Sequence, residues 1–306
     1  MSSHSAVLKN ILSKKKAVIP LAVISLYVVM AVFFEVADVI SQANNTVAPH
    51  LASSSEIFAS PSLRHWLGTD YQGRDVLLRA MAASSTALKV GVVSGVISAV
   101  IGILLGAVAG FFGKRTDDIV VWIYSTIASM PSLLFILALA LLVSRNFLSP
   151  SLAGTVKTAA AILRVEPGTL AVYCAIGLTG WVTLCRTVRA ETMKLKKMPY
   201  IDAARVAGVS NIIIILRHII PNVMHLVIIY FTLTFAGAVM LEVIVSYLGF
   251  GVQNAPSWGV MISDGQEQLW RGIWWELAAA TGFLFVLVLV LNLLGDALRD
   301  ILDPKN

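Results

Sequence analysis

Charged side chains are scarce in this 306-residue sequence. Asp, Glu, Lys and Arg make up 13% of it, about half the share that is usual in soluble domains. Hydrophobic residues make up 58%, and one water-soluble core cannot bury so much apolar surface. The composition therefore excludes an ordinary soluble domain and predicts a polytopic membrane protein. The net charge of +6 is better explained by orientation in a membrane than by nucleic-acid binding.

Motifs for catalysis and nucleotide binding are also missing. The sequence contains no HExxH, no CxxC pair and no GxSxG, and its five histidines show no ligand spacing. The stretch "GAVAGFFGKRT" fails as a phosphate loop, because Val108 stands where Gly is needed and Arg115 where Ser or Thr is needed. We therefore expect no catalytic, metal-binding or cofactor-binding residues in this chain, and we expect it not to be an enzyme.

Cysteines and intramembrane charges are few. Cys174 and Cys185 lie eleven residues apart in one apolar run, about 16 Å along a helix, so they cannot form a disulfide with each other. Glu35, Lys89 and Glu242 lie near the ends of apolar runs, where we expect them to snorkel toward water. A carrier driven by protons or sodium usually keeps a carboxylate near the midplane. Since none is evident, energy for uphill transport would come from another chain.

Apolar stretches long enough to cross a bilayer as helices occur six times. They cover about residues 17–36, 88–112, 118–143, 169–187, 222–244 and 276–295. The first is too long for the core of a signal peptide, so we expect it to be retained as a span. The sequence thus predicts an all-α membrane protein with six transmembrane helices and both termini on one side.

The distribution of Lys and Arg predicts the orientation. Of the 23 Lys and Arg residues, 15 fall on the side that would hold both termini (1–16 and 296–306), the turn 113–117 and the loop 186–221. The positive-inside rule makes this side cytoplasmic. The loop 37–87 would then be extracytoplasmic.

Small residues recur along the second span. Gly91 and Gly95 are four residues apart, and so are Gly102, Gly106 and Gly110. This spacing makes a flat stripe that lets another helix approach closely, either from a partner subunit or from the same chain. Pro131 should kink the third span.

The stretch "YIDAARVAGVSNIIIILRHIIPN" (200–222) separates two apolar runs. Pro199 is a natural helix start and Gly208 a natural helix end, so we expect a short charged helix between them. "NIIIILRHII" has too few charges for a solvated loop and is too short to span, which predicts a segment at the membrane face leading through Pro221 into the fifth span. The alternative is that the loop is an inert amphipathic surface helix.

The residues of this loop carry a resemblance to a known family. Ala203-Ala204, Gly208 and Ile220-Pro221 resemble, in type and spacing, the "EAA…G…I-LP" loop of binding-protein-dependent ABC importer permeases, with Asp202 in place of the usual Glu. In that family the short helix docks in a groove of a cytoplasmic ATPase. The resemblance implies an ATPase-coupling role for Asp202, Ala203, Ala204, Arg205, Gly208 and Pro221.

Further stretches resemble the C-type subunit of the dipeptide/oligopeptide/nickel permease family. They are "HWLGTDYQGRDVLLR" (65–79), "SYLGFGVQNAPSWGVMISDG" (246–265) and "NLLGDALRDILDPK" (292–305). On this resemblance Asp70, Arg74 and Asp75 lie outside, near the pore mouth, where they either pair with one another or meet substrate.

The resemblance implies a type I ABC importer permease in the bacterial cytoplasmic membrane, with a core at 88–295 and a coupling loop at 188–221. It implies four partner subunits beside lipid: a homologous B-type permease, two ATPases that use ATP and Mg, and an extracytoplasmic substrate-binding protein. The chain would form half of a pore for peptides. Nickel or another chelate is the alternative cargo, and a non-transporting scaffold or a secondary carrier is an alternative class.

The loop 144–168 is longer than is usual in that family. Its stretch "SLAGTVKTAAAILRV" predicts an external helix. Either it is a lineage-specific insertion, or it contacts the substrate-binding protein.

Overall fold

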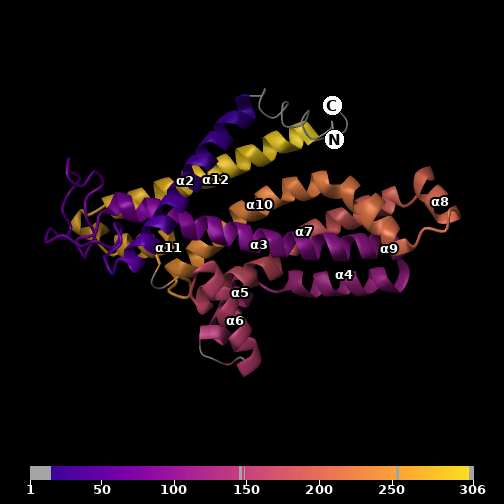
Figure 1. Cartoon of the computed structure of the whole chain (residues 1–306), viewed down its shortest axis with the longest axis horizontal. Coiled ribbons are helices and arrows are strands. Elements are labelled where there is room, and N and C mark those ends of the chain that lie inside the picture. The colour runs from indigo at the N-terminus through magenta and orange to yellow at the C-terminus, as the bar shows by residue number, and fades with distance from the viewer. Residues whose placement is uncertain (1–14, 145–146, 148, 253–254, 303–306) are drawn as a thin grey trace.

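Helices dominate the computed structural model, which describes residues 15–144, 147, 149–252 and 255–302 (Figure 1). Expectations for residues 1–14 and 303–306 lie outside the described residues. The helices are α2 (Lys15–Ala43), α3 (Val76–Phe112), α4 (Lys114–Ser129), α5 (Ser132–Ser144), α6 (Pro150–Leu163), α7 (Pro167–Leu195), α8 (Pro199–Val206), α9 (Asn211–Ile214), a π-helix (Ile215–Ile219), α10 (Ile220–Tyr247), α11 (Trp258–Gln266), a 3-10 turn (Leu269–Arg271) and α12 (Trp275–Leu302).

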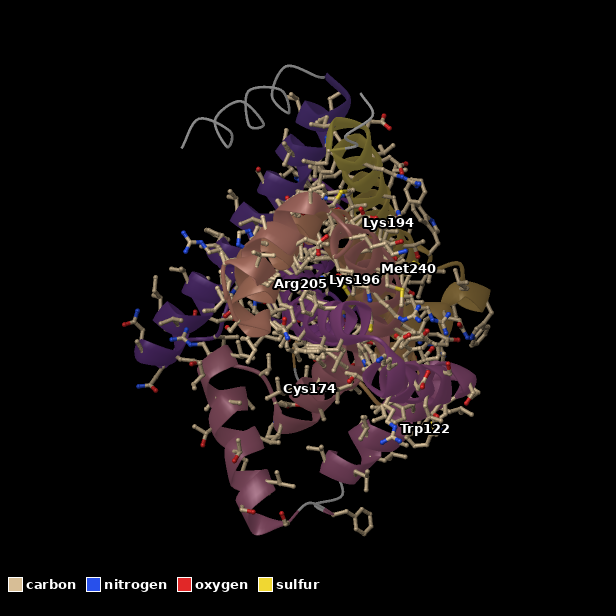
Figure 2. All side chains as sticks on the ribbon, turned by 90° about the vertical axis from the view of Figure 1, so that its right-hand side faces the viewer. Trp122, Cys174, Lys194, Lys196, Arg205 and Met240 are labelled. Atoms are coloured by element: carbon tan, nitrogen blue, oxygen red, sulfur yellow. The ribbon has the colours of Figure 1, made fainter. Side chains whose placement is uncertain are left out.

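The described helices confirm the all-α membrane fold. Five of them are long and apolar enough to cross a membrane: α2, α3, α7, the run Asn211–Tyr247, and α12. A sixth crossing is reached if α4 and α5 are counted as one broken span. The start of α2 lies beside the end of α12 (Figures 1 and 2).

The third predicted span is broken rather than mildly kinked. α4 and α5 meet at 88°, and the break falls at Met130 and Pro131. Proline lacks the N–H that would continue the helical hydrogen bonds, and its ring disfavours helical geometry in the preceding residue. Met130 has an extended backbone (φ −86°, ψ 136°), which accounts for so large a turn.

Most spans extend further than the apolar runs suggest. α3 begins at Val76, where the side chain of Asp75 accepts a hydrogen bond from the backbone N–H of Leu78 at 3.0 Å and caps the helix. With 37 residues, α3 is about 55 Å long, well above the roughly 30 Å of bilayer hydrocarbon. It runs along the length of the molecule between α2, α7 and α10 (Figure 1).

The glycine stripe of α3 packs against helices of the same chain. A Cβ on Gly91 or Gly95 would overlap the rings of Phe235 or Phe231 of α10. Further along, Gly102 faces Leu184, while Gly106 and Gly110 face the backbone carbonyls of Cys185 and Arg189 in α7. Of the two alternatives left open by the sequence, the described contacts therefore favour packing within the chain.

The isoleucine-rich segment leads through Pro221 into α10, as the sequence predicts. Residues 211–247 form one continuous helical run, and Ile214, Ile215 and Ile219 are buried against the ends of α3 and α7. The π-helix Ile215–Ile219 ends two residues before Pro221. A π-turn there accommodates a residue that would clash in a regular helix and cannot donate a backbone hydrogen bond.

The predicted helix in the loop 144–168 is present as α6, which ends at Arg164 in left-handed geometry (φ 52°, ψ 49°). α8 lies at one end of the molecule, and the loop residues 44–75 lie at the other (Figure 1).

Because α3 and α7 are in close contact, we expect that adding one methyl group at Gly106 lowers the stability of the protein. In Gly106→Ala the new Cβ would lie 2.7 Å from the carbonyl oxygen of Cys185 and 2.9 Å from Cβ of Val188. Overpacking of this kind costs about 1–3 kcal/mol, so the melting temperature of the purified protein should fall. The control is Gly282→Ala in α12, where nothing lies within 4 Å. Equal melting temperatures for the two variants would contradict this account of the contact.

Candidate functional site

α8 forms a short helical knob between α7 and α9. Pro199 occupies its first turn, and Gly208, just after its end, has a φ of +78° that favours glycine. The backbone N–H of Gly208 donates to the carbonyl of Arg205 at 3.0 Å, and that of Val209 donates to the carbonyl of Ala204 at 3.1 Å. The start and end expected from the sequence are therefore those of the structure.

One face of α8 is anchored and the other is open. Ile201 is completely buried in a cluster with the ends of α3 and α7, and burying such a side chain stabilises its attachment by about 1.5–3 kcal/mol. The guanidinium of Arg205 lies over the ring of Phe111 at 5.3 Å and donates to Asp202 at 3.1 Å. Asp202 and Ala203 are exposed, and Val206 is 90% exposed. α8 thus presents an outward face on a fixed base.

The surroundings of α8 are tied together by basic residues. Lys196 donates to the carbonyl of Gly110 at 2.7 Å, which caps the end of α3. Arg189 of α7 makes two hydrogen bonds to Asp117 of α4, one of them at 2.6 Å. Figure 2 looks onto this end and labels Lys194, Lys196 and Arg205 on it. The end that carries α8 is therefore both basic and rigidly joined to α3 and α4. Pro221 lies apart from α8, exposed at the start of α10.

An open groove lies between α5, α7 and α10, and we call it the hydroxyl groove. Its lining consists of Ser132, Ile176, Thr179, Gly180, Thr183, Tyr230, Leu233, Thr234, Gly237, Ala238 and Leu241. Among the residues that the structure describes, no charged side chain lines it, and nothing comes within 4 Å of a Cβ placed on Gly237, which leaves open space. Most of the lining surface is apolar, and hydroxyl groups, which both donate and accept hydrogen bonds, are set within it. The groove therefore offers uncharged polar contacts in an otherwise apolar wall.

Comparison with known proteins identifies the family. Residues 102–306 match the family described as "Binding-protein-dependent transport system inner membrane component", which is more than half of the chain. The chain belongs to this family.

Named relatives of this permease include the dipeptide transport system permease protein of Bacillus subtilis, 33% identical over 85% of this chain and 75% of the relative. The oligopeptide transport system permease protein of Escherichia coli is 35% identical over 79% of this chain and 73% of the relative. The oligopeptide transport system permease protein of Salmonella typhimurium is 34% identical over 93% of this chain and 87% of the relative. The permease is accordingly a multi-pass protein of the bacterial cytoplasmic membrane, as the sequence predicts.

At the end opposite α8, the permease holds a cluster of charges around one buried arginine. Arg79 donates to Asp70 at 2.5 Å and to Glu276 at 2.7 Å, and Asp70 and Glu276 are almost completely buried. Asp264 lies 3.7 Å from Arg79, and burial raises the pKa of this carboxyl although Arg79 opposes the shift. We call Asp70, Arg74, Arg79, Asp264 and Glu276 the Arg79 cluster.

The sequence-predicted residues Asp70, Arg74 and Asp75 all have partners inside the fold. Asp70 accepts from the side chain of Arg74 at 2.7 Å and from the backbone N–H groups of Gln72 and Arg74. Asp75 caps α3 and lies 2.9 Å from Nδ1 of His65. These contacts favour structural pairing over substrate contact. Arg79, Asp264 and Glu276 were missed by sequence reasoning, although Arg79 closes the quoted "GTDYQGRDVLLR" stretch.

The expectation that intramembrane charges snorkel is wrong for Glu242. Its side chain is buried and accepts hydrogen bonds from Ser246 at 2.6 Å and Ser257 at 2.9 Å. The same two serines accept from the backbone N–H groups of Val252 and Gly259. Glu242 thus fixes the loop that follows α10, because a buried carboxylate needs such partners.

Within the described part of the chain, no group of three or more His, Cys, Asp or Glu side chains is arranged to hold a metal ion. Cys174 and Cys185 are free thiols on α7.

Removing the central cation should destabilise the Arg79 cluster severely. Arg79→Gln would leave Asp70 and Glu276 buried without their main counter-charge, which costs about 3–5 kcal/mol. The exposed pair of Arg64 and Glu56, 3.7 Å apart, supplies the control: Arg64→Gln should cost at most about 1 kcal/mol. Thermal unfolding of both purified variants measures the difference, and a small effect of Arg79→Gln would show that the cluster is not essential for stability.

Proposed function

We propose that this permease is one of two transmembrane subunits of an ATP-driven importer of peptides. The observation that carries the proposal is the extent of similarity to relatives named as dipeptide and oligopeptide permeases. This chain aligns with 73–87% of the length of these relatives. The hydroxyl groove supports a peptide cargo, because its donors and acceptors suit a peptide backbone and the absence of lining charges tolerates varied side chains. Nickel or another chelate would find no carboxylate, imidazole or thiol ligand in that lining.

We propose that α8 couples ATP hydrolysis by a partner ATPase to movement of this permease. Its exposed face, with Asp202, Ala203 and Val206, would dock in a groove of a cytoplasmic ATPase. The excess of Lys and Arg at the same end supports a cytoplasmic position. The ATPases would bind ATP and Mg, and this chain would catalyse no reaction and bind no cofactor of its own.

The complete transporter would hold a homologous B-type permease, two ATPase subunits and an extracytoplasmic substrate-binding protein. The hydroxyl groove of this chain would face that of the second permease, and the two together would line the path. Closure of the ATPases would move α8, and α7 would carry the movement to Thr179 and Thr183 in the groove.

A bulky side chain placed in the hydroxyl groove tests whether peptides pass through that groove. Gly237→Trp places an indole where a Cβ meets nothing within 4 Å, so the fold should persist while peptide uptake by the reconstituted transporter falls at least about tenfold. Gly282→Trp is the matched control, since that glycine of α12 is equally unobstructed and lies outside the groove lining. Equal uptake by the two variants would refute the assignment of the path.

The backbone at Gly208 tests the coupling. A β-branched side chain is strained at a φ of +78°, so Gly208→Val should reduce transport and leave ATP hydrolysis poorly coupled to peptide. Asn adopts left-handed geometry more readily, so Gly208→Asn should retain most of the coupling. The readout is the number of peptides moved per ATP hydrolysed, and wild-type coupling in Gly208→Val would count against the role of α8.

A further inference from the structure

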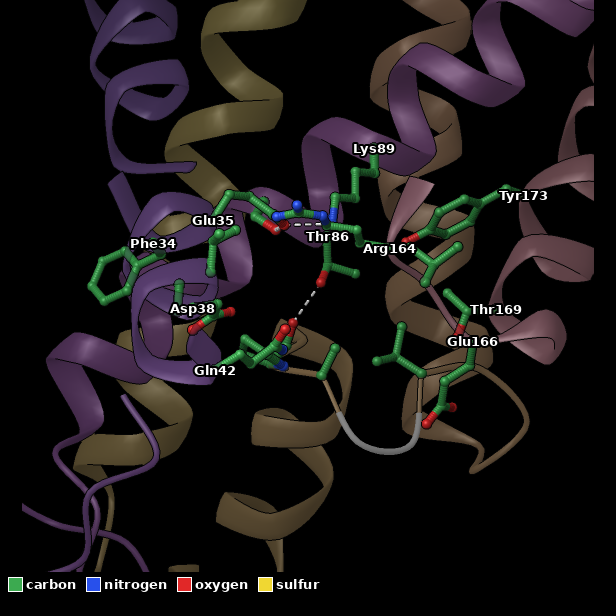
Figure 3. Close-up of a pocket in the computed structure, with 17 residues that line it drawn as sticks. Phe34, Glu35, Asp38, Gln42, Thr86, Lys89, Arg164, Glu166, Thr169 and Tyr173 are labelled. Carbon is green, nitrogen blue, oxygen red and sulfur yellow. Dashed lines mark hydrogen bonds and ion pairs between the residues drawn. The ribbon is translucent and has the colours of Figure 1, made fainter. Parts of the chain in front are cut away.

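A polar pocket lies between the ends of α2, α3 and α7 that are remote from α8 (Figure 3). We call it the α2–α7 pocket. Six of its lining side chains carry the argument: Glu35, Asp38, Lys89, Arg164, Thr169 and Tyr173. In Figure 3 Asp38 stands on the side of α2, whereas Thr169 and Tyr173 stand on the side of α7. None of these residues belongs to the hydroxyl groove or to α8.

Buried polar atoms in this pocket lack partners. Thr169 is 4% exposed and Tyr173 is 1% exposed, yet neither Oγ1 of Thr169 nor the hydroxyl of Tyr173 has a hydrogen-bond partner within the described residues. A buried polar group without a partner costs about 1–3 kcal/mol. Two such groups lining one pocket indicate a polar occupant that satisfies them.

Asp38 contributes a third buried atom without a hydrogen-bond partner among the described residues. Its Oδ1 atom is buried and lies 3.5 Å from Nδ1 of His50 without making a hydrogen bond. Burial lowers the pKa of His50 to about 4, so His50 is neutral at physiological pH and offers Asp38 no positive charge. Asp38 is therefore available to a cationic group of an occupant.

Positive charge stands in the same pocket. Lys89 is paired with Glu35, which also accepts from Ser85 at 2.6 Å, and an ammonium group has three donors, so Lys89 can bind a further anion. Arg164, the residue that ends α6, lines the pocket as well. The pocket thus presents the cations Lys89 and Arg164 beside the carboxylates Glu35, Asp38 and Glu166, a mixture that complements a zwitterion carrying an anionic and an ammonium group.

An apolar groove adjoins the pocket. It runs between α2 and α3 and ends at Leu163 of α6, and it shares Glu35, Ser85 and Lys89 with the α2–α7 pocket. Exposed valines line it: Val28, Val32, Val36 and Val92. Because α2 and α3 are membrane-spanning helices, this groove opens toward lipid rather than toward water.

We propose that the pocket and groove together bind one aminophospholipid. The phosphate lies against Lys89 and Arg164, the ammonium group lies toward Asp38, and one acyl chain fills the groove of valines. The position of Asp38 along α2 agrees with a headgroup site. Asp38 lies five residues, about 8 Å, before the end of α2, and lipid headgroups lie near the ends of spanning helices. A free peptide has the charges but no acyl chain for the groove, so the joined groove favours a lipid.

α6 completes this site with two consecutive residues. Leu163 closes the apolar groove and Arg164 enters the polar pocket, and the left-handed backbone of Arg164 turns the chain from α6 toward α7. This assigns a role to the long 144–168 loop that does not require contact with a binding protein.

Native mass spectrometry of the purified transporter, titrated with dioleoylphosphatidylethanolamine or dioleoylphosphatidylglycerol, tests the proposal. We expect the ethanolamine lipid to bind about tenfold more tightly, since it alone offers an ammonium group to Asp38. Arg164→Gln and Val92→Trp should each weaken its binding about tenfold, and Tyr173→Phe should weaken it less. Val96→Trp, one turn along α3 from Val92 and outside the groove lining, should leave binding unchanged.

Several results would overturn the proposal. They are equal affinity for the two lipids, equal effects of Val92→Trp and Val96→Trp, and full competition by glycerophosphoethanolamine, which has no acyl chains. If Val92→Trp still bound the lipid but no longer retained the second permease chain, the groove would instead be a contact with that chain. A phosphatidylethanolamine with a photoreactive acyl chain needs no variant: it should label residues 28–36 and 88–93 of the wild-type protein, and labelling elsewhere would refute the site.

Discussion

The close approach of α3 to α7 is the contact on which the rest of the molecule depends. Gly106 and Gly110 lie directly against the backbone carbonyls of Cys185 and Arg189, so no side chain separates the two helices there. In a membrane, where lipid tails are as apolar as the helices, such van der Waals packing is a main source of association. The partly buried Arg189–Asp117 pair and the hydrogen bond from Lys196 to the carbonyl of Gly110 fix the same end of the bundle. α3, α4 and α7 therefore form one rigid unit.

This rigidity connects the two places where the permease would act. α7 lines the hydroxyl groove with Thr179 and Thr183 and continues to Leu195, and only residues 196–198 separate it from α8. Ile201 seats α8 on the ends of α3 and α7. We infer that a displacement of α8 reaches the groove as a movement of α7, because packed interfaces switch between discrete arrangements rather than deform continuously.

Sequence reasoning identified the features that depend on local chemistry. Long apolar runs predicted the spans, and Pro199 and Gly208 predicted the bounds of α8. It did not identify features that depend on distant residues. Arg79 and Glu276 are 197 residues apart in the sequence. Each lies beside an apolar run, and nothing local in the sequence indicates that they pair. Glu242 was assigned to snorkelling because Ser257, its second partner, lies 15 residues away in a loop. Pro131 predicted a kink, whereas the 88° break also needs the extended backbone of Met130, which a proline in the sequence does not by itself specify.

The central claim is that the end carrying α8 meets the ATPase. Site-specific photo-crosslinking in the assembled transporter tests it most directly, with a photoreactive amino acid at Ala203 on the exposed face of α8, or at Leu63, which is 98% exposed at the opposite end. The account predicts ATPase adducts from Ala203 and none from Leu63. ATPase adducts from Leu63, with none from Ala203, would contradict it.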